Sequence, residues 1–492
     1  MIAILAALAL VAAPDASGLD FTSPSGLRVY GSFRSKLLVD TNFESRPEEP
    51  LAENVLELQS HALLGASADF GERARIVVEA RLWHRAVEQR SPEGEFFWGL
   101  NGQNAKGTLE LDPGEAYLDL YSKWVDLRLG NQVLVMGANI SGAPADVLSP
   151  LDLREGIFFA DEPGDVKLPV LAARARGSVW GFDWTVAYVP FFVPDRYDLY
   201  GQDQALVQPG LGITVPPSNV ITTAQQDRVL QPLVETDRPK DYPQNGDLGL
   251  RITRRLGDDW TVGADYVISR EKLPRVTLDS ELARFIAEGP NASFSDPATA
   301  VSLSQRVGAG EQLVRGDFPR FAVGEVEASA LLGPVQADLD IGHSGSRLYY
   351  DRHQNPVFHP TSTGVLTVAD ARGTDLTLAF TATVLWIHDV PEGEELVLLD
   401  PEGAGDSAHQ VFDAFGALLA GYKFDRGRFE AELRAYYDVR QRSNAEGIRG
   451  TWNATDHVHL VVGYQHFGGS SVSPFGYFRR NDAAWAEVRL EL

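Results

Sequence analysis

Apolar and charged residues alternate along one segment of this chain after another, with the two-residue period that places successive side chains on opposite faces of a β-strand. In LRVYGSFRSKLLVD (27–40), Leu, Val and Phe share one face, whereas Arg, Ser and Lys share the other. The segments ARIVVEARLWHRAV (74–87) and FEAELRAYYDVR (429–440) repeat the pattern with Glu and Arg on the polar face. Helical spacing of apolar residues is almost absent, so the sequence predicts an all-β protein.

The connections between these segments alternate in length. Very short turns, such as Gly71-Glu72 and Gly333-Pro334, join some pairs, and long stretches rich in Gly, Pro and Asp join the others. The long stretches cover 41–53, 88–112, 136–167, 192–246, 270–316, 344–360 and 389–408. Short periplasmic turns and long extracellular loops are typical of transmembrane β-barrels, and strands of ~10 to 15 residues are long enough for a tilted crossing of a membrane.

We therefore predict an all-β fold consisting of a single antiparallel transmembrane β-barrel, with short periplasmic turns, long extracellular loops and one loop folded into the lumen. Counting gives eighteen strands, and sixteen is the alternative because the segment 361–371 is weakly patterned. The strands are expected at 26–40, 54–69, 73–87, 113–122, 124–135, 168–178, 181–191, 247–256, 260–270, 317–332, 335–343, 361–371, 375–388, 409–424, 427–441, 445–453, 457–468 and 482–492.

The apolar run from Ile2 to Ala13 is too short to span a bilayer as a helix, and its position fits the hydrophobic core of a secretory signal peptide. Residues 1–18 are expected to be that signal peptide, with an approximate cleavage site, and residues 19–492 the barrel. The alternative is a buried N-terminal strand or helix. No other segment has ~18 consecutive apolar residues, so the sequence excludes transmembrane helices and favours a place in the bacterial outer membrane.

The composition excludes several classes of partner and site. The chain has 68 acidic and 43 basic residues, a net charge of −25, which argues against nucleic acid because phosphate contacts need clustered Lys and Arg. Cysteine is absent, which rules out disulfides, zinc-thiolate sites and a cysteine nucleophile. The expected partners are the lipid of the outer membrane, a small solute or polymer substrate, and periplasmic export or efflux components.

If the apolar faces meet lipid, the charged faces line the lumen, and a barrel of this size needs either an aqueous channel or a plug. The charges could pair across neighbouring strands and make the wall rigid, or they could form a selectivity ladder. The predicted lumen charges are Arg81, Arg85, Arg128, Arg174, Arg176, Arg251, Arg434 and Arg489, with Glu79, Glu115, Asp119, Asp126, Asp265, Glu325, Glu327, Glu430 and Glu432.

The stretch GNQVLVMGANISGAPADVLSPLDLREG (130–156) begins as a strand and becomes a polar loop. On the long-loop side of a barrel it is expected to fold inward over 136–167 and to narrow the lumen. Its charged residues could hold the loop against the wall or could meet the solute, and the first role is favoured. These residues are Asp146, Asp152, Arg154 and Glu155.

The longer segment EAYLDLYSKWVDLRLGNQVLVMGANISGAPADVLSPLDLREG (115–156) resembles the signature region of a family of uncharacterised bacterial outer-membrane proteins related to the alginate-export porins. Similar elements are LPVLAARAR (168–176), VPFFVPDRY (189–197) and YQHFGGSSVSPFGYFRRND (464–482). The resemblance implies an outer-membrane barrel that passes a solute, without giving the substrate. Alginate would need a strongly cationic conduit, and the acidic neighbours of Arg174, Arg176 and Arg251 argue against it.

The candidate pore-lining or constriction residues combine the signature region with charges on the expected lumen faces. They are Glu115, Tyr117, Arg128, Gln132, Asp146, Asp152, Arg154, Glu155, Arg174, Arg176, Arg251, Glu432 and Arg434. The sequence assigns no catalytic residue, cofactor or metal. GHSGS (342–346) lacks the final glycine of a serine-hydrolase elbow, and HVH (457–459) has no third ligand fixed beside it by the sequence.

The leading hypothesis is thus an outer-membrane, porin-like channel for a solute or an exported polymer. The alternative is a non-conducting barrel that serves as an adhesin or surface scaffold through the loops 192–246 and 270–316. A barrel enzyme such as a lipase would need a nucleophile with a base beside it, and the sequence shows neither, so the protein is not expected to be an enzyme.

Overall fold

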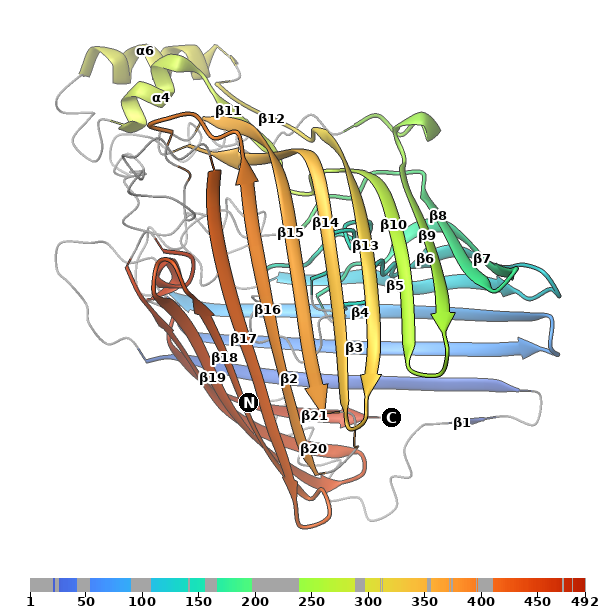
Figure 1. The fold of residues 1–492 in the computed structure, drawn as a ribbon. Coiled ribbons are helices and arrows are strands. Elements are labelled where there is room, and N and C mark those ends of the chain that lie inside the picture. The colour runs from blue at the N-terminus through green and yellow to red at the C-terminus, as the bar shows by residue number, and fades with distance from the viewer. Residues whose placement is uncertain are drawn as a thin grey trace.

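The computed structural model describes residues 21–22, 26–41, 54–89, 108–139, 142–154, 166–196, 239–287, 297–309, 311, 313–351, 355–370, 372, 375–394, 396, 410–470, 473–479 and 481–491. The expected signal peptide and the candidate residue Glu155 lie outside these residues. Within them, 18 long antiparallel strands form one closed barrel, which confirms the predicted fold class and strand number (Figure 1).

Each strand pairs with the next one along the chain, and the last pairs with the first. In this order the strands are β2 (Leu27–Asp40), β3 (Asn54–Phe70), β4 (Ala74–Gln89), β5 (Thr108–Leu120), β6 (Asp126–Gln132), β7 (Val170–Val179), β8 (Phe182–Val189), β9 (Asp247–Leu256), β10 (Trp260–Arg270), β13 (Arg320–Leu332), β14 (Val335–Tyr350), β15 (Pro356–Asp370), β16 (Leu376–His388), β17 (Gln410–Phe424), β18 (Phe429–Asp438), β19 (Ser443–Thr455), β20 (Val458–Gly468) and β21 (Ala483–Glu491).

Closure of the barrel depends on the pairing of β2 with β21, which runs from Ser32 opposite Glu491 to Asp40 opposite Ala483. The short strand β1 (Phe21–Thr22) pairs with β2 beyond that register. Closure satisfies the backbone hydrogen bonds of every strand, and this is the condition under which a sheet can lie in hydrocarbon.

The two faces of the sheet follow the alternation in the sequence. On β9, Leu248, Leu250 and Ile252 are exposed, whereas Asp247 and Gly249 between and beside them are buried. On β13, Val326 is 57% exposed, while its neighbours Glu325 and Glu327 are buried. The apolar side chains therefore face outward, and the charged ones face the interior of the barrel. No helix in the described residues is long and apolar enough to cross a membrane.

The connections at one end of the barrel are all short turns, and most of those at the other end are longer, the exceptions being the β14–β15 and β18–β19 connections. The hairpin turn between β13 and β14 lies at the opposite end of the barrel from the helices α4 (Ser280–Ala287) and α6 (Pro297–Gly308) (Figure 1). These helices, with the hairpin of β11 (Arg275–Leu278) and β12 (Val314–Asp317), occupy part of the connection predicted at 270–316. That connection therefore has secondary structure of its own.

The prediction of a long loop at 344–360 is wrong. The strand β14 continues to Tyr350 and β15 begins at Pro356, so most of this stretch belongs to the sheet. The register shifts between Ser344 and Arg347, and this irregularity breaks the two-residue alternation on which the prediction depended. Beyond it, Tyr349 and Val357 pack against a buried apolar cluster that includes Ile387 and Leu396.

The strand β6 is short. The sequence predicts a strand over 124–135, but β6 ends at Gln132, and the chain leaves the sheet there. Leu134 and Met136, which follow Arg128 and Gln132 in the two-residue alternation, are buried against other strands of the barrel. The chain returns to the sheet at Val170, where β7 begins. The connection between these two strands, residues 133–167, is the segment that positions the candidate site.

Candidate lumen constriction

The 133–167 segment is bonded to strands far from β6. The backbone N–H of Ala145 donates to Glu325 Oε2 of β13 over 2.7 Å. The N–H groups of Ala138 and Asn139 donate to the two carboxylate oxygens of Asp340 on β14, over 3.0 and 2.8 Å. Because Glu325 and Asp340 face the interior of the barrel, these bonds attach the segment to the inner face of the sheet.

Asp340 is the most heavily bonded of these anchors. Its side chain is fully buried, and it accepts a third hydrogen bond from Asn139 Nδ2 over 2.6 Å. The same amide group also donates to the backbone carbonyl oxygens of Asp338 and Val365. A buried carboxylate that accepts several hydrogen bonds holds its donors firmly, because loss of any one leaves a polar group unsatisfied.

Apolar packing adds to these bonds. Met136, Ala145 and Leu148 are buried in one cluster with inward-facing residues of β8, β10 and β13, among them Val267 and Val323. Two glycines of the wall make the close approach possible. A Cβ at Gly249 would lie 2.8 Å from Leu148 Cδ1, and one at Gly342 would lie 2.4 Å from Pro144 Cβ. The wall therefore has no side chain at these two positions, where the segment packs on it.

The variant Gly249→Val should loosen the 133–167 segment, because its side chain would overlap Leu148 and Met136. Overpacking of this kind costs about 2 kcal/mol, which corresponds to roughly a thirtyfold rise in local opening. Hydrogen exchange of peptides from 133–154 in the folded barrel measures this rise. Gly324→Val is the control, since a Cβ at Gly324 meets no atom within 4 Å. Equal exchange in the two variants would show that the segment does not depend on this contact.

A second set of contacts holds the other end of the described segment near β4 and β5. The guanidinium of Arg154, whose side chain is 8% exposed, pairs with Asp152 at 2.7 Å and with Glu110 at 3.1 Å. It also lies over the ring of Trp83, 3.9 Å from the centroid. Burial acts to lower the pKa of Arg154, but the pairs with Asp152 and Glu110 outweigh it and raise the pKa above its ordinary value.

Two further carboxylates order this end. Asp195, in the stretch after β8, accepts a hydrogen bond from the N–H of Leu151 over 2.7 Å, and burial raises its pKa to about 6. Asp146 forms an ion pair with Lys167 and accepts a hydrogen bond from the N–H of Met136. Burial raises the pKa of Asp146, although Lys167 opposes this effect. These contacts therefore join parts of the segment to each other and to the stretch that follows β8.

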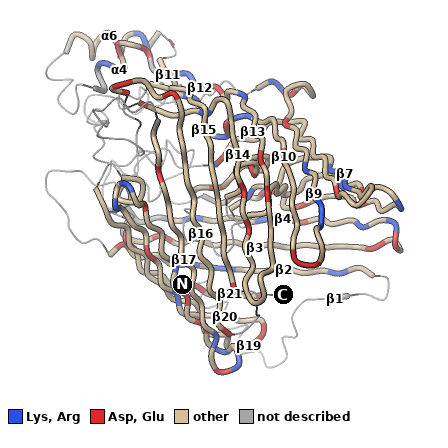
Figure 2. Tube along the Cα trace, viewed as in Figure 1, with Lys and Arg blue, Asp and Glu red and all other residues tan. Residues whose placement is uncertain are grey.

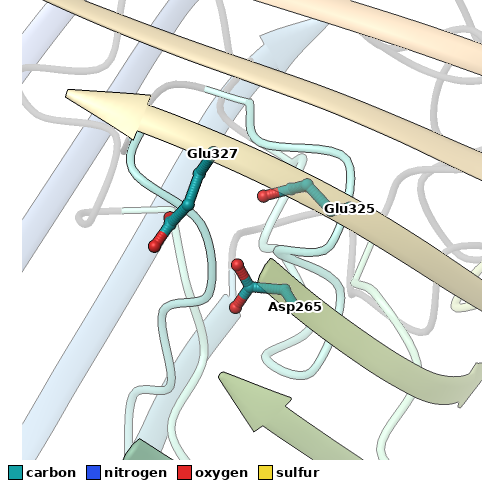
Figure 3. Close-up of side chains that lie close together, drawn as sticks. All are labelled: Asp265, Glu325 and Glu327. Atoms are coloured by element: carbon teal, nitrogen blue, oxygen red, sulfur yellow. The ribbon is translucent and has the colours of Figure 1, made fainter. Parts of the chain in front are cut away.

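Buried acidic side chains gather where the segment meets β10 and β13. Asp265, Glu325 and Glu327 point toward one another, as Figure 3 shows. Arg251 of β9 forms a bidentate pair with Glu327, at 3.0 and 2.8 Å, and its Nε lies 3.9 Å from Asp265. These three acids belong to the predicted lumen faces but not to the predicted site, and only Arg251 of this group is a candidate residue.

A basic row lies on β6 and β7. Arg128 forms a bidentate pair with Asp119, at 2.7 and 2.9 Å, and stacks 3.7 Å above the ring of Tyr117. Arg174 stands opposite Arg128 in the sheet register, and no ion pair of Arg174 is found among the described residues. Arg176 lies 3.5 Å from Asp126. Figure 2 shows acidic and basic residues on strands all along the barrel. Charged residues are therefore present for both expected roles, pairing across neighbouring strands and ion selectivity.

The remaining candidates fall into two places. Glu115 accepts a hydrogen bond from the N–H of Val133, and Gln132 donates to the carbonyl of Ala172, so both lie where the segment leaves the sheet. Glu432 and Arg434 pair with each other on β18, at 2.6 Å, far from β6 in the strand order. The histidines noted in the sequence do not converge on each other: His459 bonds to Asn453, and His466 bonds to Asp482.

Several residues at the site escape the sequence analysis. They are Trp83, Glu110, Lys167, Asp195, Gly249 and Asp340. Asp340 could have been found, because it falls on the polar face of the strand predicted at 335–343. The others are identified only by their contacts with the 133–167 segment, which join residues far apart in the chain.

No protein-family model and no curated protein sequence matches the chain. Solved structures align with nearly its whole length. OmpF of Salmonella typhi, in complex with daunomycin, has 12% identity and a TM-score of 0.42 over 96% of this chain and 99% of its own. Acinetobacter baumannii OccAB2 has 8% identity and a TM-score of 0.49 over 96% and 99%. Pseudomonas aeruginosa OccK5 (OpdH) has 9% identity and a TM-score of 0.46 over 97% and 100%. At these identities the likeness concerns the fold alone.

The protein's place in the cell follows from its own architecture. The barrel is closed and antiparallel, with apolar side chains outside and charges inside. It has short turns at one end and long connections at the other. Barrels of this form cross the outer membrane of bacteria. The chain is an outer-membrane β-barrel.

Proposed function

We propose that the protein is a porin-like channel, through which a small hydrophilic solute or an exported polymer crosses the outer membrane. The solute passes along a polar lumen that the 133–167 segment narrows. The single observation that carries the proposal is the pair of attachment points of this segment. It is bonded to Asp340 of β14 and, through Arg154, to Glu110 of β5, and these strands lie on different sides of the closed sheet.

The order of the strands shows how far apart the two attachment points are in the barrel wall. Between β5 and β14 stand β6, β7, β8, β9, β10 and β13, a third of the wall. The attachment of the segment to inward-facing residues of both strands supports the proposal that it passes across the interior. An eighteen-stranded barrel is too wide for side chains alone to fill, so the space left beside the segment is aqueous.

The nature of the solute is constrained by charge. A basic row of Arg128, Arg174 and Arg176 lies on β6 and β7, and a group of buried acids lies on β10 and β13, so the wall is mixed in sign. A polyuronate such as alginate would need a continuous cationic path. The relation to the alginate-export porins rests on the sequence motifs alone, and we do not propose alginate as the substrate.

Recording from the purified protein in planar bilayers tests the proposal. We expect stepwise currents of uniform size, and swelling of liposomes in small sugars but not in large ones. The alternative, a non-conducting adhesin or scaffold, predicts neither. Absence of conductance in the wild type and also in a variant without residues 138–165 would contradict the channel hypothesis.

The selectivity of the channel should depend on Arg174, because no ion pair of this residue is found among the described residues and its charge acts on passing ions. Arg174→Glu is expected to shift the reversal potential in a KCl gradient toward cations. The matched control is Arg372→Glu, which changes an exposed arginine that pairs with Asp370 at the turn between β15 and β16. Identical reversal potentials in Arg174→Glu and the wild type would remove Arg174 from the conducting path.

A further inference from the structure

The acidic group on β10 and β13 has the geometry of a cation site. Asp265 and Glu325 stand opposite each other in the register of the two strands, and Glu327 is the next inward-facing residue on β13. Each of the three offers a carboxylate oxygen, and these oxygens all lie within 4.8 Å of one another. The three side chains lie close together (Figure 3). All three residues are nearly inaccessible, at 4%, 4% and 5% exposure.

Among the described residues, the positive charge beside these three acids is too small to balance their negative charge. Asp340 stands opposite Glu327 in the register, so four carboxylates are gathered on three neighbouring strands. The cationic neighbour is Arg251, whose Nε and guanidinium NH₂ groups are bonded to Glu327. The N–H of Ala145 supports one oxygen of Glu325, and those of Ala138 and Asn139 support Asp340. Repulsion between ionised carboxylates out of water is strong, so the group needs another positive partner.

Hydrogen bonding points to the same need. The backbone N–H of Gly137 approaches Asp265, but neither carboxylate oxygen of Asp265 accepts a hydrogen bond of normal geometry from the described residues, and neither does Oε1 of Glu325, although all three atoms are buried. The side chain of Asp265 is completely inaccessible, and its carboxylate is directed at the other two acids. Buried polar atoms are nearly always paired, so three such oxygens beside one another indicate a ligand that binds oxygen.

We propose that Asp265, Glu325 and Glu327 bind a divalent cation, Ca²⁺. Carboxylate oxygens without nitrogen or sulfur are the ligands of hard cations. Ca²⁺ binds oxygen at about 2.4 Å, so two of its ligands lie at most ~4.8 Å apart, whereas Mg²⁺ limits this separation to ~4.2 Å. The three oxygens, all within 4.8 Å of one another, are close enough to share one Ca²⁺ ion. Water completes the coordination on the side of the lumen.

The site would also fasten the 133–167 segment. The backbone of Gly137 passes so close that a Cβ there would lie 2.8 Å from Glu325 Oε1 and 3.5 Å from Asp340 Oδ1. Gly137 has φ +86°, a conformation that favours glycine. A bound cation draws Glu325 into place, and Glu325 holds Ala145. The cation thus stabilises the attachment of the segment to the wall.

The test uses the full-length barrel refolded in detergent without lipopolysaccharide, which itself binds divalent cations, and then treated with a chelator. Thermal unfolding is followed without metal, with millimolar Ca²⁺ and with millimolar Mg²⁺, and Ca²⁺ binding is measured by calorimetry. The wild type is expected to bind one Ca²⁺ and to melt several degrees higher with it, with a smaller effect of Mg²⁺.

Asp265→Asn separates binding from a merely structural role. The amide keeps the shape but removes a charge, so this variant should bind Ca²⁺ at least tenfold more weakly and yet melt higher than the wild type in the absence of metal. Asp413→Asn is the control: it removes a buried acid of β17 that lies beside Asp438 of β18, and among the described residues no third carboxylate joins them in such a group. It should leave Ca²⁺ binding unchanged.

Two results would overturn the site: no binding and equal melting of the wild type with chelator and with Ca²⁺, or equal Ca²⁺ binding by Asp265→Asn and the wild type. Neither result tests the channel proposal, since these measurements involve no transport. A channel that fails to conduct could still bind Ca²⁺, so the two proposals fail separately.

Discussion

Replacing residues 138–165 with a short Gly-Ser linker is expected to raise single-channel conductance severalfold. The replacement removes the part of the chain that is bonded to Asp340 and Glu325 on one side and to Glu110 on the other. The strands pair with one another over their whole length independently of this segment, so the barrel should still fold. The freed carboxylates of Asp340 and Glu325 should also make the wider channel more selective for cations.

The matched control replaces Ser280–Gly308, the stretch that contains α4 and α6 at the end of the barrel (Figure 1). Its length is similar, and its helices pack on each other through Leu282 and Leu303. Its loss should change conductance much less. Heat-modifiable migration in gels verifies that both variants have folded. Equal conductance in the two variants would mean that the 133–167 segment does not limit the current.

Arg154→Ala is expected to have the largest effect among single substitutions. Asp152 and Glu110 would lose their shared cation, and Trp83 would lose the guanidinium that covers its ring. Because both carboxylates are partly exposed, the cost is about 2 kcal/mol, below the ~3–5 kcal/mol of a fully buried pair. Released at this end, the segment should fluctuate, which would raise the mean conductance and the current noise.

The comparison for Arg154→Ala is Arg372→Ala, which removes an exposed ion pair with Asp370 that contributes little to stability. Hydrogen exchange of 142–154 should rise in the first variant and stay unchanged in the second. If Arg154→Ala left both noise and exchange at the level of the wild type, the contacts of Arg154 would not hold the segment.

The strands could be predicted from the sequence because lipid and water impose opposite demands on alternate residues. This demand is visible on β9, where the exposed Leu248, Leu250 and Ile252 alternate with Asp247, Gly249 and Arg251. It weakens where the register shifts, as between Ser344 and Arg347, or where apolar residues meet on the inner face, as at Tyr349 and Val357. There the prediction of a loop at 344–360 failed.

The site could be predicted only in part. Asp152 and Arg154 were candidates because charges in a loop need a reason, and the structure places them in one ion-paired group. Their partner Glu110 lies 44 residues before Arg154, and Asp340 lies 201 residues after Asn139. These contacts exist because closure of the barrel brings distant strands around one interior, and no local pattern in a single sequence records which inward residues will meet there.

The most direct test of the central claim, that the 133–167 segment lies in the conducting path, uses the absence of cysteine from the chain. Val135→Cys introduces a thiol at a side chain that is 41% exposed within the segment, and Val326→Cys introduces one on the outward face of β13. A charged, membrane-impermeant methanethiosulfonate reagent is added during single-channel recording. The account predicts a stepwise, irreversible fall of current through Val135→Cys and no change through Val326→Cys. An undiminished current through fully labelled Val135→Cys would contradict it.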